Sequence, residues 1–123
     1  HDLVQFIEYF SDCHNALFVV YNKDYSDYVG FTWFSEIVPN FKAHTAIYIR
    51  KKYRKILTDE VSKLSMDFMF NHFNLKELWQ HTPWENAHKL SLRLGSTEIA
   101  VLPNYVLIDG VPNNYYISRL QRT

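Results

Sequence analysis

Hydrophobic and polar residues alternate along the chain with two periods, one typical of helices and one typical of strands. Near the start, Leu3, Phe6, Ile7 and Phe10 have the spacing of one helical face, which predicts an amphipathic helix over residues 2–10. Two more helices are expected at residues 56–73 and from residue 83 or 84 to residue 94.

Six other segments are rich in β-branched and aromatic residues and predict strands. The period of two is clearest where Thr45, Ile47 and Ile49 alternate with His44 and Tyr48. Turn signals, among them Asp109-Gly110 between the last two segments, separate the strands. The strands are expected at residues 15–21, 28–38, 43–50, 75–82, 97–106 and 115–120.

This order of elements predicts the fold class. Helices and strands do not alternate regularly, which disfavours a doubly wound parallel sheet. We therefore expect a mixed α/β (α+β) fold, with a mostly antiparallel central sheet flanked by helices. No linker or repeat interrupts the sequence, so residues 1–123 are expected to form a single domain.

The amino-acid composition disfavours some partners and some cellular compartments. Hydrophobic residues make up 47% of the 123 residues and aromatic residues 17%, which argues against disorder. Thirteen basic residues balance thirteen acidic ones, so nucleic acid and membrane surfaces are disfavoured as partners. Cys13 is the only cysteine, which excludes an intramolecular disulfide and favours a reducing compartment such as the cytoplasm. No secretory signal is evident, and a chain that starts at His1 inside a helical pattern predicts a truncated beginning.

Four motifs in the same order resemble the GNAT superfamily of N-acetyltransferases. Residues 28–31 (Tyr-Val-Gly-Phe) are similar to the family's third strand, and residues 47–55 are similar to its fourth strand and the basic cofactor loop. Residues 75–95, which end in Leu-Gly, are similar to the fifth strand and the helix after it. Asp109-Gly110 with the Tyr-rich segment after it is similar to the closing hairpin. The resemblance covers about residues 15–120 and implies that the family's first strand and first helix are missing.

The resemblance implies acetyl-CoA as cofactor. The start of a helix suits a pyrophosphate because its N–H groups are unpaired and its dipole is positive there. Backbone groups at two strand residues would pair with the pantetheine, and the pyrophosphate would lie over residues 52–58. The residues so implied are Tyr48, Ile49, Lys52, Arg54, Lys55, Ile56, Leu57, Thr58 and Asn86.

Two positions depart from the family pattern. Family members have small residues where this chain has Lys55 and Leu57, and Leu57 is expected to project toward the cofactor. Ser91 occupies the position at which many members have a tyrosine that protonates the leaving thiolate, and a serine hydroxyl is a much weaker acid.

Glu36 and His44 are the candidates for deprotonating an acceptor amine, directly or through water, although polar strand residues without a catalytic role explain them as well. His72, His81 and His88 lack metal-ligand spacing, so no metal site is expected. The aromatic group of Tyr105, Tyr115 and Tyr116 is consistent with an acceptor pocket, a partner surface or simple packing.

Two functions remain open at this level. The first is an acyl-CoA-dependent N-acetyltransferase that acts on an unknown small-molecule or protein amine. The second is a catalytically inactive structural or partner-binding protein of the same fold, such as a phage virion or accessory component, acting with a protein partner or as a homo-oligomer. A nucleic-acid-binding role for the basic loop is disfavoured by the neutral overall charge.

Overall fold

A computed structural model describes residues 4–11 and 14–122. Its elements are β1 (Val4–Ser11), β2 (Ala16–Asn22), β3 (Asp27–Val38), β4 (Lys42–Ile49), the 3-10 turn η1 (Lys51–Tyr53), α1 (Arg54–His72), β5 (Glu77–Thr82), α2 (Glu85–Arg93), β6 (Thr97–Ile108) and β7 (Val111–Gln121). Cys13 lies outside the described residues, so the structure does not bear on the predictions made from it. No helix in the described part of the chain is long and apolar enough to cross a membrane.

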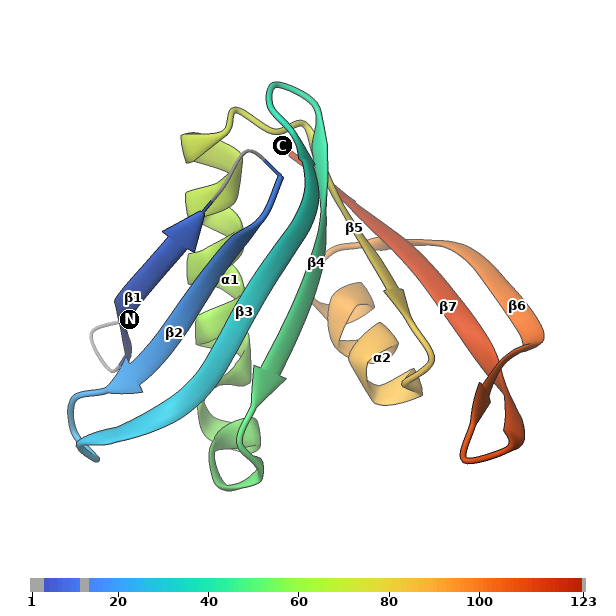
Figure 1. The fold of residues 1–123 in the computed structure, drawn as a ribbon, viewed down its shortest axis with the longest axis horizontal. Helices are drawn as coiled ribbons and strands as arrows, with labels where there is room; N and C mark the ends of the chain where they lie inside the picture. Colours follow the sequence, from blue (N-terminus) through green and yellow to red (C-terminus); the bar gives the residue numbers. More distant parts are fainter. Residues whose placement is uncertain (1–3, 12–13, 123) are drawn as a thin grey trace.

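The seven strands form one sheet in the order β1-β2-β3-β4-β5-β7-β6 (Figure 1). Only the β4–β5 pair is parallel, and the other pairs are antiparallel. The prediction of a mixed, mostly antiparallel sheet with helices is therefore confirmed. The six strands and two later helices expected from the sequence are all present, with ends that differ by a few residues.

The predicted helix at residues 2–10 is wrong, because residues 4–11 form strand β1, which pairs with β2. A register shift between Phe6 and Glu8 places a bulge in this strand. One extra residue interrupts the period of two, so a bulged strand can imitate helical spacing. Backbone N–H and C=O groups along the edge of β2 pair with residues 4–11, and this pairing makes them a strand.

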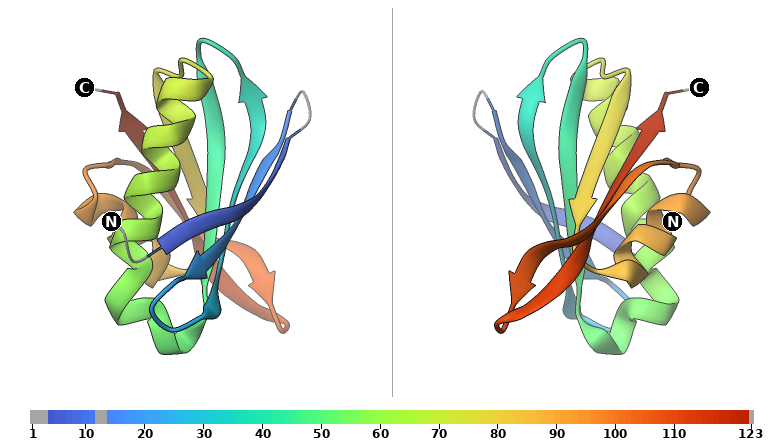
Figure 2. Two further views of the ribbon diagram at one scale, coloured as in Figure 1. Left: turned by 90° about the vertical axis from the view of Figure 1, so that its left-hand side faces the viewer. Right: turned by 90° about the vertical axis from the view of Figure 1, so that its right-hand side faces the viewer.

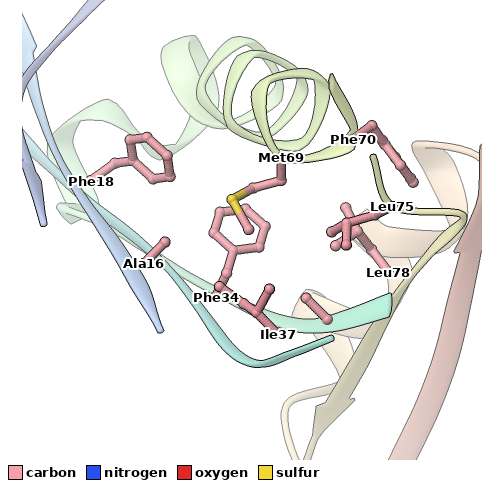
Figure 3. Close-up of a cluster of buried hydrophobic side chains, with 9 residues drawn as sticks. Ala16, Phe18, Phe34, Ile37, Met69, Phe70, Leu75 and Leu78 are labelled. Carbon is pink, nitrogen blue, oxygen red and sulfur yellow. The ribbon is translucent and has the colours of Figure 1, made fainter. Parts of the chain in front are cut away.

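Both helices lie on the same side of the sheet (Figure 2). α1 packs on the β1–β4 part and α2 packs on β5 and β7. The larger core cluster lies between α1 and the sheet, where Met69 meets Phe34 (Figure 3) and Phe34 meets Phe18 edge to face. A second cluster surrounds the start of α1 and includes Leu57 and Ile49. This second cluster fixes the end of β4 against the first turns of α1.

The parallel pair β4–β5 is short and then separates. Its only Cα partners are Lys42 with Glu77, Ala43 with Leu78 and His44 with Trp79. Beyond them β4 continues to Ile49 and β5 continues beside β7. Figure 1 shows the two strands diverging from this point, with α2 below the gap. The edge of β4 that faces β5 is therefore unpaired over residues 45–49.

Candidate functional site

The diverging strands border a cleft with a volume of about 540 Å³. Its walls come from β4, the first turns of α1, and α2 with the residue before it. The lining residues are Ile47, Tyr48, Ile49, Arg54, Thr58, Trp84, Asn86, Ala87, Leu90 and Arg93. The size lies within the range of small-molecule sites.

The structure brings together part of the predicted cofactor set. Tyr48, Ile49, Arg54, Thr58 and Asn86 all line this cleft. Four other predicted residues of that set, Lys52, Lys55, Ile56 and Leu57, do not line it. The unpaired edge of β4 and the start of α1 meet at this cleft, as the family resemblance implied.

Leu57 lies in the core, and the expectation that its side chain projects toward the cofactor is wrong. The side chain is fully buried in the cluster with Val29, Ile49 and Val61. A helix of this orientation needs an apolar side chain there to pack on the sheet, whereas Lys55 on the same turn is exposed. Neither long side chain obstructs the described cleft.

The side chains of the basic loop lie at two sites: Arg54 lines the cleft, whereas Arg50 and Lys52 bond Asp27 outside it. Asp27 at the start of β3 accepts hydrogen bonds from Tyr53 at 2.7 Å, Arg50 at 2.9 Å and Lys52 at 3.4 Å. These bonds, foremost that from Tyr53, lower the pKa of Asp27 from its ordinary 3.8 to about 2. The carboxylate in turn raises the pKa of Tyr53. Lys52 thus joins the 3-10 turn to the sheet outside the cleft.

The N–H groups at the start of α1 are partly used. Tyr53 donates to the Arg50 carbonyl, and Arg54 donates to the Lys51 carbonyl through the 3-10 turn. No side chain of the described residues caps either helical start. Lys55 and Ile56 therefore supply the two first-turn donors that the α-helical pattern leaves unpaired.

Two guanidinium groups line the cleft. Arg54 donates from Nε to the Ile49 carbonyl at 2.8 Å, which holds the group at the end of β4. Arg93 lies on α2 and donates to Asp59 of α1 at 2.6 Å, so it links the two helices. The sequence reasoning missed Arg93. A basic residue in the last turn of a helix is expected for the helix dipole alone, so the sequence carried no distinct signal.

A smaller cavity of about 30 Å³, with a mostly apolar lining that includes several serine and threonine residues, adjoins the cleft and shares Ile47 and Leu90 with it. Ser91 lines this cavity and its Oγ lies 2.8 Å from both Ser96 Oγ and Ser118 Oγ. Three other lining atoms have no hydrogen-bond partner within the described chain: Thr32 Oγ1, Ser62 Oγ and Gln80 Oε1. A cavity of this size with such polar atoms in its wall can hold one or two water molecules.

The opposite face of the sheet, free of helices, carries the other predicted catalytic residues. Glu36 has a positive φ of 49° in a bulge of β3, and its Oε2 lies 3.4 Å from His44 Nδ1 on β4. The ring of His81, on β5, lies 4.6 Å from the His44 ring. Partial burial is the main cause that lowers the pKa of His81, and the nearby His44 adds to it.

The fold separates the three tyrosines that the sequence analysis grouped together. Tyr105 stacks on Tyr115, whereas Tyr116 stacks on His88 beneath the sheet. His88 also bonds Glu98 at 2.8 Å. Within residues 4–11 and 14–122, no group of three or more His, Cys, Asp or Glu side chains is placed to hold a metal ion.

No protein-family model matches the chain, and no curated protein matches it. Solved structures do match. A spermidine N-acetyltransferase from Vibrio cholerae, in complex with CoA and spermine, superposes with a TM-score of 0.80 at 22% identity, covering 89% of this chain and 67% of that one. A chimera of the Vibrio cholerae enzyme SpeG with hSSAT gives 0.79 at 22%, with 89% and 69% covered.

A third structure, SpeG from Vibrio cholerae with manganese ions, gives a TM-score of 0.79 at 22% identity and covers 89% of this chain and 66% of that one. All three superpose over 89% of this chain, so they share its fold despite the low identity. The chain therefore has the fold of the GNAT superfamily of N-acetyltransferases.

Proposed function

We propose that this protein is an acyl-CoA-dependent N-acyltransferase that transfers an acetyl group to an amine. The single observation that carries the proposal is the cleft at the separation of β4 from β5, with an unpaired strand edge, a helix start and two guanidinium groups around it. A thioester linked to a diphosphate needs these three elements together.

The residues of the cleft fit such a donor. The free edge of β4 at Tyr48 and Ile49 offers backbone groups to a pantetheine amide. Arg54, with the Lys55 and Ile56 amides behind it, offers charge and N–H donors to a diphosphate. The indole of Trp84 lines the cleft and is 58% exposed, so it offers a flat surface for stacking an adenine ring.

We assign roles to the remaining predicted residues from their positions in the structure. We assign Thr58 and Asn86 to polar contacts with the donor and Arg93 to a second charged contact. Ser91 would pass a proton to the leaving thiolate through water in the adjoining small cavity. Glu36 and His44 lie on the helix-free face, from which we propose that the acceptor amine enters. The donor supplies the activated acyl group, and the chain orients it.

Similar proteins suggest features to look for. The Vibrio cholerae spermidine N-acetyltransferase has been solved in complex with CoA and spermine and as a dodecamer. We propose by analogy that this chain also takes an amine acceptor and forms a homo-oligomer. A reducing compartment such as the cytoplasm suits its single cysteine.

Titration calorimetry with acetyl-CoA tests the proposal. We expect a dissociation constant on the order of micromolar, weakened about tenfold by Arg54→Ala and by Arg93→Ala. Lys52→Ala is the matched control, because Lys52 bonds Asp27 outside the cleft, and it should bind with nearly unchanged affinity. Quenching of Trp84 fluorescence on binding, absent in Trp84→Leu, gives an independent signal.

The inactive, partner-binding alternative makes the opposite prediction. No heat at millimolar acetyl-CoA from folded protein would reject the transferase and favour that alternative. Equal losses in Lys52→Ala and Arg54→Ala would show that binding depends on overall loop charge and not on the cleft.

A further inference from the structure

We propose that His81 is the general base for the acceptor amine, with His44 beside its ring and Glu36 beside His44. The inference rests on the proposed acyl transfer and adds the residue that takes the proton. It starts from two imidazoles that the fold places side by side at the point where β4 and β5 separate.

Position is the first argument. His44 and Trp79 form the last Cα pair between β4 and β5, and His81 lies two residues farther along β5. The two rings, 4.6 Å apart, therefore span the strands at the start of their divergence. Residues 78, 80 and 82 of β5 are buried toward the helices, so His81 belongs to the opposite face. His81 does not line the cleft but lies beside the separation of the strands, so we infer that an amine arriving from that face passes His81 before it reaches the thioester.

Surroundings are the second argument. The His81 ring is accessible to solvent and lies beside Tyr115 at 6.1 Å and Trp79 at 6.3 Å. These rings form a partly apolar wall on which the carbon part of an amine can rest. His44 is less exposed, and its Nδ1 already faces Glu36. His81 is thus the member of the pair that is open to an incoming group.

Protonation is the third argument. Partial burial and the charge of His44 lower the pKa of His81, so its imidazole is neutral at pH 7 and can accept a proton. The charged or titratable groups that act on it are Glu36 on β3 and Lys42 and His44 on β4, and Tyr115 of β7 faces its ring. Glu77 of β5 and Arg119 of β7 contact the neighbouring Trp79. Glu36 acts in the opposite direction to His44 and raises the pKa of His81.

The step balances in atoms and charge. The neutral amine nitrogen bonds to the thioester carbonyl carbon, and the carbon–sulfur bond breaks. One proton leaves the nitrogen for the free imidazole nitrogen of His81. The departing sulfur takes a proton from Ser91 through water and leaves as a thiol. Solvent returns a proton to Ser91. His81 then returns its proton to solvent.

The test measures acetyl transfer from acetyl-CoA to a panel of primary amines (spermidine, 2-phenylethylamine and L-lysine) between pH 5 and 9, with acetyl-CoA affinity measured in parallel. We expect His81→Gln to lower kcat at pH 7 by about 100-fold or more while acetyl-CoA affinity stays unchanged. His72→Gln, the same change at an exposed histidine at the end of α1 on the other side of the sheet, is the matched control and should stay within about threefold of the parent.

Two further variants test whether His81 acts as a base or has only a structural role. His44→Gln removes a neighbouring positive charge and should move the midpoint of the rate-against-pH profile upward. Glu36→Gln removes a negative charge and should move it downward. NMR titration of the His81 ring should show the same two opposite shifts, without need of an acceptor.

The outcomes distinguish the two proposals. A protein that fails to bind acetyl-CoA removes the proposed function and the base with it. Normal binding with an unchanged rate and profile in His81→Gln overturns the base and leaves the transferase. Transfer to no amine of the panel, or an NMR midpoint of His81 that neither variant moves, also overturns the base.

Discussion

The β2–β4 half of the molecule and the β5–β7 half are held to their helices by different forces. Beneath α1 the buried side chains are mostly apolar, and aromatic rings such as Phe18 and Phe34 meet edge to face. Over residues 77–121, by contrast, the buried side chains other than Leu78 are polar: Gln80, Thr82, His88 and Ser118. Here α2 is attached by the Ser91–Ser118 and His88–Glu98 bonds.

The difference has a consequence for the cleft, whose two walls belong to the two halves. Apolar burial stabilises more per side chain than a net hydrogen bond does. We therefore infer that β4 and the start of α1 form a rigid wall and that α2 forms the wall that opens more easily. Amide hydrogen exchange should be slower in α1 than in α2.

The largest expected effect comes from the apolar half. Phe34→Ala removes a fully buried ring from the main cluster and should lower the free energy of unfolding by about 3–5 kcal/mol. Denaturant titration measures this change. A loss below 1 kcal/mol would show that the cluster is not the main source of stability.

Next comes the contact between β3 and β4. A Cβ at Gly30 would lie 2.0 Å from the Tyr48 carbonyl oxygen, a backbone atom that cannot move without shifting β4. Gly30→Ala should therefore cost about 1–3 kcal/mol and weaken acetyl-CoA binding as well. Calorimetry on the folded fraction checks the second effect, and unchanged affinity would argue that β4 does not line the donor site.

In the polar half the expected effect is smaller. Ser118→Ala removes a bonding partner of Ser91 and should cost about 1 kcal/mol. Exchange of the α2 amides should rise while exchange of the α1 amides stays constant. A uniform rise in both helices would mean that the two halves unfold together and would remove the comparison.

The smallest effect depends on pH. Because the folded pKa of Asp27 is lowered to about 2, its stabilising contribution is present above pH 4 and is lost as pH falls toward 2. Tyr53→Phe deletes the bond that contributes most to this shift. The variant should have a lower thermal midpoint than the parent at pH 6, and the difference should shrink near pH 2. A difference that stays constant with pH would assign the loss to packing of the Tyr53 ring.

The sequence predicted the elements of the fold where local preference and burial agree. The strand of alternating residues at 43–50 and the long helix after it were found because their patterns are those of one buried face. Residues 4–11 were assigned the wrong element, because a bulge disguised the period of the strand. Tyr48, Ile49 and Arg54, which were predicted for the cofactor site, line the cleft, and their contact with a cofactor stays a prediction.

Local chemistry in the sequence determined the class of fold, the strand edge and helix start that meet at the cleft, and the absence of a phenol at Ser91. Only the tertiary structure decided which basic residues face the cleft, that Leu57 turns into the core, and that His81 stands beside His44. Residues 37 positions apart become neighbours through the pairing of β4 with β5, and no local periodicity encodes which strands pair or where they separate.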